Sequence, residues 1–512
     1  MADRFKNLID GKRVDAVGGG VFDDTNPANR SEVIGAFPRS DYRDADHAVE
    51  VARAARGSWG ELSSPRRASL LLRAADLLRA QQEAFVELIV REAGKVQAEA
   101  LAEVRDALDA VAGFAGEGLQ PDPARRSFPD AGERLAFGLR VPVGVVAVIA
   151  SWCHPLGGIV HQVVPALVAG CPVVLKPAED APLVATRFAE LLLEAGIPSA
   201  VLGIVHGTGE EAGAPLVRHP DVALVSFSGS SGVGREVAIA CAAVHKPAQL
   251  DLGGRSATVV LDDADMEAAL EGAVSGGMAT SGQRRAPATR VLVHKKALRE
   301  FSERLASRVQ SLQVGDGLSS GVDLGPLIND GRLKRTHAFT RGALKEGAKL
   351  LCGGEVLREG EYRKGFFYAP TVLGDVTPTM RAARDPACGP TIALLAIGGM
   401  DEGLETAERI GIGIGLAVYT QRLDRACRAI DRAAVRSVMV NAPIGTEGFG
   451  PTAPWYRQGE GGGSPLGAYM EWRSIALRPG RGWRRISGHP AGGAPPEASA
   501  GAASGGAERP KA

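Results

Sequence analysis

The chain has 512 residues, with 59 Lys and Arg, 59 Asp and Glu, 6 Cys and a formal net charge of zero. Because the charges balance, there is no net field to attract nucleic acid or an anionic membrane. No apolar run approaches the roughly 20 residues that span a bilayer, and the first residues lack the apolar core of a signal peptide. The Cys surroundings are typical of reduced core thiols, and no Cys/His spacing indicates a metal site. We therefore expect a cytoplasmic protein of two or three domains.

The first third of the chain predicts short strands followed by long helices. The expected elements, in chain order, are strand-like pieces within residues 7–35, a helix that begins at Asp44, and amphipathic helices over about 66–93 and 95–115. Residues 120–133 are rich in Pro, Gly and charge. The next segment, Arg134–Val141, is predicted to be a strand of a hairpin arm.

From residue 143, apolar strands alternate with helices. Strands are expected at Val145–Ala150, Pro172–Lys176, Val201–Val205 and Val222–Phe227, with helices at Pro155–Val168, Ala181–Ala195 and Gly234–Val244. This alternation is typical of a parallel sheet covered on both faces. It predicts a doubly wound architecture that binds ligands at the carboxyl ends of its strands.

A second α/β unit is predicted to begin near Gly253. Its expected strands are Ala257–Leu261, Arg290–His294, Thr371–Leu373 and Val438–Asn441, and its helices Met266–Val274, Lys296–Val309 and Leu404–Ile410. Tyr469–Leu477 is predicted to be a last, exposed strand. Residues 485–512 are mostly Gly, Ala, Pro, Ser and Glu, a composition that predicts a disordered tail.

Several motifs occur in a characteristic order. They are Trp152 with Pro155, Leu175-Lys176-Pro177-Ala178-Glu179, Phe227-Ser228-Gly229-Ser230, Leu250-Asp251-Leu252-Gly253-Gly254, Gly282-Gln283 before Arg290-Val291-Leu292-Val293, Leu324-Gly325-Pro326, and Ala369-Pro370-Thr371. Together they resemble the aldehyde dehydrogenase superfamily over roughly residues 7–478. The resemblance implies an aldehyde dehydrogenase-like α/β fold, with a doubly wound cofactor-binding domain, a second α/β catalytic-type domain and an oligomerisation hairpin. The expected boundaries are 1–123 and 143–252 for the cofactor-binding domain, 253–453 for the catalytic-type domain, and 124–142 and 465–480 for the oligomerisation elements.

The resemblance implies that five residues bind NAD: Trp152, Lys176, Glu179, Gly229 and Ser230. A carboxylate such as Glu179 accepts hydrogen bonds from a ribose diol and repels a 2′-phosphate, which favours NAD over NADP. Gly229 and Ser230 open a helix after a strand, and such a helix N-terminus suits a pyrophosphate. Gly-rich strand–helix turns are also common structural features of α/β folds. With Lys176 and Glu179 present as well, NAD binding is the favoured interpretation.

The sequence departs from the family pattern at each position that performs the chemistry. The family nucleophile is a Cys, and this position is Arg285, whose guanidinium cannot attack a carbonyl. The side-chain amide that holds the oxyanion is replaced by Cys153, and the general-base Glu by the shorter Asp251. The later Glu-x-Phe-Gly-Pro motif has become Pro386-Ala387-Cys388-Gly389-Pro390.

Four such changes favour a catalytically inactive member of the family, a pseudoenzyme. The alternative is an active NAD-dependent aldehyde oxidoreductase with a relocated nucleophile, either Cys153 or Cys388, with Arg285 lowering the pKa of the thiol. The less specific interpretation is that both Cys residues fill space as small hydrophobes.

Two further hypotheses concern the arginines. Arg285 could pair with Asp251 and block the pocket, since a buried Arg needs a partner. Alternatively, Arg284 and Arg285 could bind an anionic ligand. The resemblance also predicts a homo-oligomer, dimer or tetramer, or a hetero-oligomer with an active aldehyde dehydrogenase. By the resemblance, the loop Thr446–Gly459 lines the substrate pocket, and its sequence departs from the family pattern. The sequence therefore does not identify the aldehyde.

Overall fold

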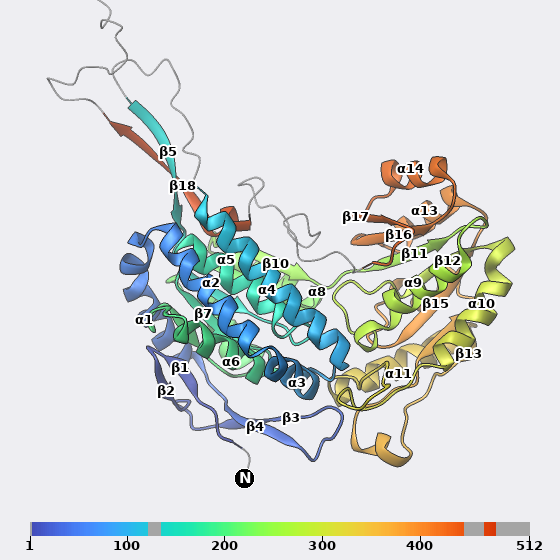
Figure 1. Cartoon of the computed structure of the whole chain (residues 1–512), viewed down its shortest axis with the longest axis horizontal. Helices are drawn as coiled ribbons and strands as arrows, with labels where there is room; N and C mark the ends of the chain where they lie inside the picture. The colour runs from blue at the N-terminus through green and yellow to red at the C-terminus, as the bar shows by residue number, and fades with distance from the viewer. Residues whose placement is uncertain (1–2, 121–134, 445–464, 478–512) are drawn as a thin grey trace, which may run out of the picture. The chain divides into compact units, whose positions relative to one another are not determined.

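The computed structural model describes residues 3–120, 135–444 and 465–477. These residues form two seven-stranded sheets and two smaller two-stranded sheets (Figure 1). No helix in the described ranges is both long enough and apolar enough to cross a membrane.

The first large sheet has the order β10-β9-β6-β7-β8-β1-β2. Its strands are β1 (Asn7–Ile9), β2 (Lys12–Val14), β6 (Val145–Ile149), β7 (Val173–Lys176), β8 (Leu202–Ile204), β9 (Val222–Gly229) and β10 (Ala248–Leu252). The five strands from β10 to β8 are parallel, and β1 and β2 continue the sheet antiparallel. The chain runs from β6 outward through β7 and β8 and then crosses to β9 on the other side. The strand order therefore reverses between β6 and β9.

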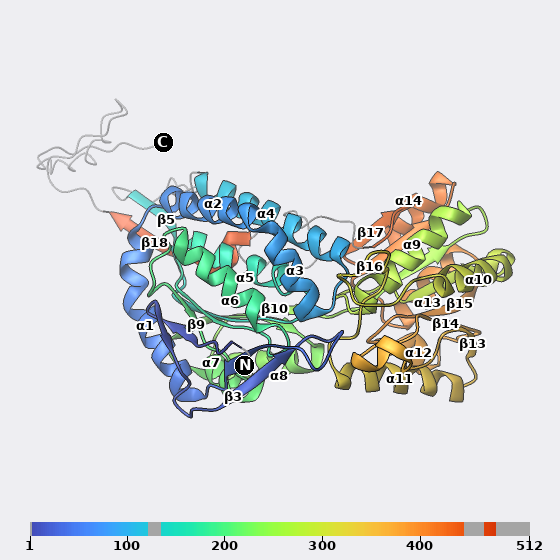
Figure 2. The same cartoon turned by 60° about the horizontal axis from the view of Figure 1, so that its bottom comes forward.

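Alternating side chains of β6 pack against two different layers of helices. Val146 and Val148 belong to the core shared with α2–α6, whereas Val145 and Ala147 belong to the core shared with α1, α7 and α8. Figure 2 shows α2–α6 on one side of this sheet and α7 and α8 on the other. The helices are α1 (Tyr42–Glu61), α2 (Ser64–Ala80), α3 (Gln82–Ala93), α4 (Gln97–Leu119), α5 (Gly157–Ala169), α6 (Pro182–Glu194), α7 (Ala214–Arg218) and α8 (Ser231–Ala242). This two-layer cover explains why the strands are continuous apolar runs.

The second large sheet has the order β13-β14-β15-β12-β11-β16-β17 and is parallel except for β13. Its strands are β11 (Ser256–Val260), β12 (Arg290–His294), β13 (Lys349–Cys352), β14 (Thr371–Gly374), β15 (Thr391–Ile397), β16 (Gly415–Tyr419) and β17 (Ser437–Val440). Val291 and Val293 pack on the side of α9 and α10, and Leu292 on the side of α13 and α14. The helices are α9 (Met266–Met278), α10 (Lys295–Gln310), α11 (Asp330–Lys345), α12 (Arg381–Arg384), α13 (Met400–Arg409) and α14 (Leu423–Arg432).

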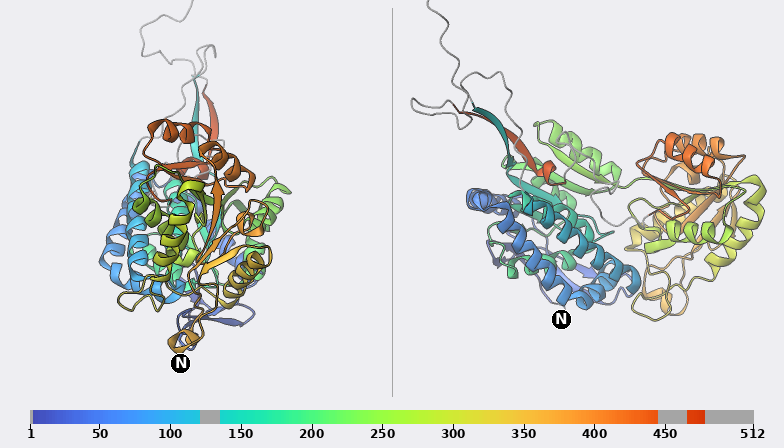
Figure 3. Two further views of the ribbon diagram at one scale, coloured as in Figure 1. Left: turned by 90° about the vertical axis from the view of Figure 1, so that its right-hand side faces the viewer. Right: turned by 45° about the horizontal axis from the view of Figure 1, so that its top comes forward.

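The two small sheets are a hairpin of β3 (Val21–Thr25) and β4 (Val33–Pro38), and a pair of β5 (Leu135–Pro142) and β18 (Met470–Leu477). The pairing of β5 with β18 joins the two expected oligomerisation segments into one sheet (Figure 3). The chain also divides into two compact units, Met1–Asp122 with Arg140–Trp472, and Pro123–Leu139 with Arg473–Ala512. The predicted tail (485–512) and the loop Thr446–Gly459 lie outside the described residues.

The predicted α/β fold class with its two parallel sheets is confirmed. Several predicted helix bounds were wrong. The helix predicted at Gly234–Val244 begins at Ser231, and the helix predicted at Met266–Val274 continues to Met278. The expected helix 66–93 is two helices that meet at Gln81, whose φ and ψ of −105° and 15° leave the helical path. The first helix begins at Tyr42 rather than Asp44, because Asp41 is its N-cap and Asp44 completes a capping box. The structure also contains elements that the sequence analysis did not predict, namely α7, β10, α11, β13, α12, β15, β16 and α14.

Candidate active site

Three of the five residues assigned to NAD follow the central strands of the first sheet. Trp152 follows β6, and Gly229 and Ser230 lie at the end of β9, so all three occupy the carboxyl ends of the two strands between which the strand order reverses. Lys176 ends β7, directly beside Ile149 of β6 in the parallel register. In open α/β sheets this reversal point is where ligands bind. The structure thus brings the five residues to one edge of one sheet.

Lys176 and Glu179 form a connected pair after β7. The Lys176 side chain is buried and donates to the carbonyl oxygens of Pro177 at 2.5 Å and Gly207 at 2.8 Å, and to Glu179 Oε2 at 3.3 Å. Burial lowers the pKa of Lys176, and the nearby Glu179 carboxylate opposes this shift. The Glu179 side chain is 48% exposed. Lys176 therefore holds in place a carboxylate that remains accessible to a diol.

Helix α8 begins at the end of β9. Ser230 is its N-cap, and its hydroxyl accepts from the Val233 N–H at 3.4 Å. Gly229 lies against the ring of Phe227, and a Cβ at position 229 would be 2.5 Å from that ring. Gly229 thus lies one residue before the N-cap, where a side chain would require the Phe227 ring to move. An anion is stabilised by such a helix start.

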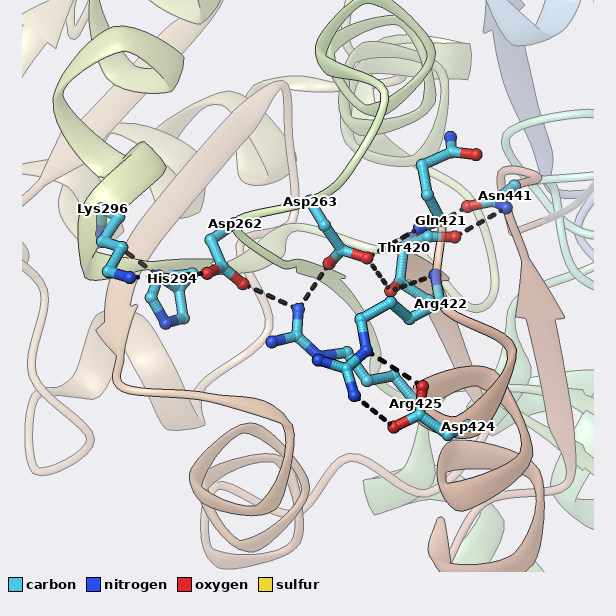
Figure 4. A network of polar contacts seen from close by, with 10 residues as sticks. All are labelled: Asp262, Asp263, His294, Lys296, Thr420, Gln421, Arg422, Asp424, Arg425 and Asn441. Carbon is cyan, nitrogen blue, oxygen red and sulfur yellow. Dashed lines mark hydrogen bonds and ion pairs between the residues drawn. The ribbon is translucent and has the colours of Figure 1, made fainter.

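The second sheet has its own reversal point, between β11 and β16, but there the polar groups bond to one another. Arg425 forms ion pairs with Asp262 at 2.7 Å and Asp263 at 2.5 Å, and Asp263 accepts from the Thr420 hydroxyl at 2.8 Å (Figure 4). The Thr420 N–H in turn donates to the Asn441 side chain at 3.0 Å (Figure 4). This edge is stabilised by the protein's own charges, which leaves the first sheet as the candidate dinucleotide site.

The loop before β12 carries the expected active-site motif in an unusual backbone conformation. Thr280, Ser281 and Gly282 have φ values of 54°, 51° and 68°. Glycine is required at 282, because a Cβ there would lie 2.1 Å from the Gly389 carbonyl oxygen. The loop is held by the Ser281 hydroxyl, which donates to Gly325 O at 2.7 Å. Non-glycine residues in this region cost energy and are concentrated at functional sites.

Gln283 is a structural part of this loop. Its side chain is buried, accepts from the Ile328 N–H at 3.0 Å and donates to Pro326 O at 3.3 Å. The backbone N–H of Gly254 donates to the carbonyl of Arg285 at 3.0 Å. This bond ties the motif that contains Asp251 to the motif that contains Arg285, and so brings both side chains into one region.

Arg285 and Asp251 form an ion pair between the guanidinium and carboxylate Oδ2. Their side chains are only 18% and 24% exposed. Burial lowers the pKa of Arg285 to about 10, so the guanidinium stays protonated at neutral pH. The pairing hypothesis, which required Arg285 to point toward Asp251 rather than into solvent, agrees with this geometry.

Cys153 is connected to the same carboxylate through two hydroxyl groups. Its Sγ lies 3.3 Å from Ser151 Oγ, which lies 3.3 Å from Ser228 Oγ. Ser228 donates to Asp251 Oδ2 at 3.2 Å. The chain of contacts thus runs from a thiol through two serines to Asp251, and Arg285 lies at its end.

Other ionisable groups surround this region. Burial, together with the charges of Lys95, Arg284 and Arg285, holds the pKa of His154 well below its usual range. Burial also lowers the pKa of His161 to about 3, and Arg285 adds to the shift. Both imidazoles are therefore neutral at physiological pH.

Cys388 is brought near the loop only through its neighbour, because Gly389 lies against Gly282. The Cys388 carbonyl accepts from the Thr336 hydroxyl at 3.1 Å. Burial lowers the pKa of Arg290, and Cys388 opposes this shift. The described contacts connect Cys153, and not Cys388, with Asp251 and Arg285. Arg284 donates to Ile444 O at 3.5 Å, at the edge of the described residues.

The sequence analysis assigned no individual role to five polar residues of this region: Ser151, Ser228, Asp180, Asn329 and Arg332. Both serines follow or end apolar strands, and hydroxyls there give no distinctive pattern. Asn329 was detectable, since an Asn followed by a polar periodic segment predicts a helix N-terminus. It is the N-cap of α11, which the sequence prediction lacked.

Comparison with known proteins agrees with this arrangement. The model of the aldehyde dehydrogenase family matches residues 14–455. The chain is 34% identical over 471 residues to an alpha-ketoglutarate semialdehyde dehydrogenase of Haloferax volcanii, covering 90% of this chain and 97% of that protein. It is 32% identical over 440 residues to the alpha-ketoglutaric semialdehyde dehydrogenase of Bacillus subtilis, covering 86% and 90%. A structure of a Bacillus cereus aldehyde dehydrogenase in complex with NAD+ superposes with a TM-score of 0.87 at 31% identity, covering 93% of this chain and 97% of that one.

The fold and the site define a doubly wound α/β protein with a dinucleotide-type strand edge and a second α/β sheet that carries the loop before β12. The chain belongs to the aldehyde dehydrogenase family.

Proposed function

We propose that this chain is a catalytically inactive aldehyde dehydrogenase family member that binds NAD and assembles into oligomers. The observation that carries the proposal is the ion pair between Arg285 and Asp251. These are the positions that the family resemblance assigns to the nucleophile and the general base. A protonated guanidinium cannot attack an aldehyde carbon, and a carboxylate engaged with it is a weak base for activating water. The residues at both catalytic positions, Arg285 and Asp251, are therefore engaged with each other in one ion pair.

NAD binding is supported by the residues at the carboxyl edge of the first sheet. The half-exposed Glu179 carboxylate, held by Lys176, suits the adenosine ribose hydroxyls. The N-terminus of α8 at Ser230 suits the pyrophosphate. When bound, NAD would supply a hydride acceptor. The Bacillus cereus relative was solved as an NAD+ complex, which adds support.

The second candidate is an active NAD-dependent aldehyde oxidoreductase that uses Cys153. The contact chain Cys153–Ser151–Ser228–Asp251 favours it, because the thiol proton could pass through two hydroxyls to the carboxylate. The Cys153 thiolate would attack the aldehyde carbon, and water would hydrolyse the resulting thioester to the acid. Lys176, Glu179 and the start of α8 would hold NAD, which would supply the two-electron acceptor that the oxidation requires. This candidate is weaker, since Arg285 already neutralises Asp251.

The deciding experiment is NADH formation by the purified protein with NAD and a panel of aldehydes. The panel includes alpha-ketoglutaric semialdehyde and betaine aldehyde, for which relatives are named. We expect no NADH from the unmodified protein, while calorimetry detects NAD binding. The double variant Arg285→Cys/Cys153→Asn, which returns a thiol and an amide to the family positions, is expected to gain measurable turnover.

Turnover by the unmodified protein that is lost in Cys153→Ser and kept in Cys427→Ser would overturn the inactive assignment. Cys427 is the matched control, because it is exposed and lies on α14.

Assembly is supported by the paired strands β5 and β18, which leave an edge for a second chain. The Arg140 guanidinium lies 5.2 Å from the centre of the Trp472 ring across this pair, and Trp472 is 39% exposed. The mass in solution, measured by light scattering, tests this part: a dimer or tetramer is expected, and a monomer contradicts it.

A further inference from the structure

A cation from the second sheet's helices lies at the carboxyl edge of the first sheet. The guanidinium carbon of Arg332, in the first turn of α11, is 5.0 Å from the centre of the Trp152 ring. Trp152 follows β6, one of the two strands at the reversal point. Arg332 therefore brings positive charge to the place where the family's dinucleotide is expected.

The position of Arg332 is determined by a specific set of hydrogen bonds. Its backbone N–H donates to the N-cap side chain of Asn329 at 2.8 Å. The Asn329 amide in turn donates to both carboxylate oxygens of Asp180 at 3.1 Å. Asp180 directly follows Glu179 in the turn after β7. The start of α11 is thus attached to the same turn that presents the candidate ribose carboxylate.

The guanidinium retains hydrogen-bonding capacity in this position. Arg332 Nε is shielded from solvent and donates to no acceptor among the residues that the structure describes. Burial raises the pKa of Asp180, and the positive charge of Arg332 opposes this shift. A half-buried guanidinium held over an aromatic ring suits recognition of a phosphate oxygen, since its planar donors match that geometry.

We propose that Arg332 is a cofactor-binding residue that pairs with the pyrophosphate of the dinucleotide, with Trp152 orienting its guanidinium beforehand. This inference rests on the proposed NAD binding and extends it to a residue that α11 supplies. It predicts that the affinity gained from Arg332 depends on the phosphate bridge of the ligand and decreases as salt concentration rises.

The test is isothermal calorimetry with the full chain and four ligands: adenosine, ADP, ADP-ribose and NAD. For Arg332→Gln, we expect affinity for ADP, ADP-ribose and NAD to fall by about 10- to 100-fold, the loss typical of a charge-assisted hydrogen bond. Adenosine affinity is expected to stay within about twofold. Arg332→Lys, which keeps the charge without the fork, should lose less.

Arg335→Gln is the matched control. Arg335 is exposed on the same helix, and its replacement removes the same charge one turn later. Its ligand affinities should equal those of the unmodified protein. Thermal unfolding of each variant verifies that α11 is still folded.

Two negative outcomes are distinct. If the unmodified protein binds NAD and Arg332→Gln binds it equally or more tightly, Arg332 does not pair with phosphate and the inference is wrong, while NAD binding stands. Tighter binding would indicate that Arg332 blocks the site instead. If the unmodified protein binds neither NAD nor ADP-ribose, the proposed cofactor function fails as well.

Discussion

At the scale of single residues, the Arg285–Asp251 contact joins two substitutions that would each be costly alone. A buried guanidinium without a carboxylate, or the reverse, leaves an uncompensated charge in a region of low dielectric. Asp is one methylene shorter than Glu, and the carboxylate of Asp251 still meets both Arg285 and the Ser228 hydroxyl. The two changes are therefore compatible in the folded protein as a pair.

This compatibility predicts a double-mutant cycle. Asp251→Asn is expected to lower the free energy of unfolding by about 2 kcal/mol, less than for a fully buried pair because both side chains are partly exposed. Adding Arg285→Gln should restore most of this loss, as measured by urea denaturation. Glu303→Gln in the exposed Arg299–Glu303 pair should produce no measurable change. Additive losses in the double variant would contradict the coupling.

At the scale of elements, helical periodicity located most of the helices but not their ends. The break at Gln81 between α2 and α3 has no Gly or Pro to mark it. Both helices pack against α4 and α6, and α2 also contacts α5. The break is thus a feature of the tertiary packing that the apolar periodicity of the sequence does not show. The elements missed after residue 320 are short or follow irregular segments, where local pattern is weak.

Two glycines of α4 have opposite expected effects. Gly113 is exposed with open space around its Cβ position, so Gly113→Ala should stabilise the protein by about 0.5–1 kcal/mol through helix propensity. At Gly118, a Cβ would lie 2.5 Å from Val168 Cγ1 of α5. Gly118→Ala should therefore destabilise by about 1–3 kcal/mol through overpacking. Denaturation midpoints of the two variants decide this, and equal shifts would refute the packing argument.

At the scale of the whole molecule, buried neutral histidines make the fold sensitive to acid. Burial lowers the pKa of His206 to about 3, and the Lys176 charge adds to the shift. The pKa of His161 is also about 3, and that of His154 is well below its usual range. Below about pH 6.5, the unfolded chain takes up protons that the folded chain does not. Stability from these groups therefore falls as pH decreases from about 6.5 toward 3.

His206→Gln tests the sign and size of this effect. Below pH 6, the variant should lose stability less steeply than the unmodified protein, by about 1.4 kcal/mol per pH unit, the contribution of one proton. The measurement is urea unfolding at pH 7, 6, 5 and 4.5. His47→Gln, at an exposed position, should leave the slope unchanged. A variant slope equal to the unmodified one would show that His206 titrates equally in both states.

The sequence by itself determined the family, the α/β class and the residues at the carboxyl ends of the first sheet. Those features are local: apolar runs form strands, and short motifs follow them at set spacings. The loss of the nucleophile was equally visible, since Arg285 stands in an otherwise intact motif.

Only the tertiary structure decided what that Arg contacts, which thiol is connected to Asp251, and that Arg332 lies over Trp152. Residues 251 and 285 meet because Gly254 bonds the backbone of Arg285, and Arg332 is positioned by the Asn329–Asp180 bonds. Such contacts join segments 34 to 180 residues apart (285 − 251 and 332 − 152), and no local pattern encodes which side chains the packing brings together.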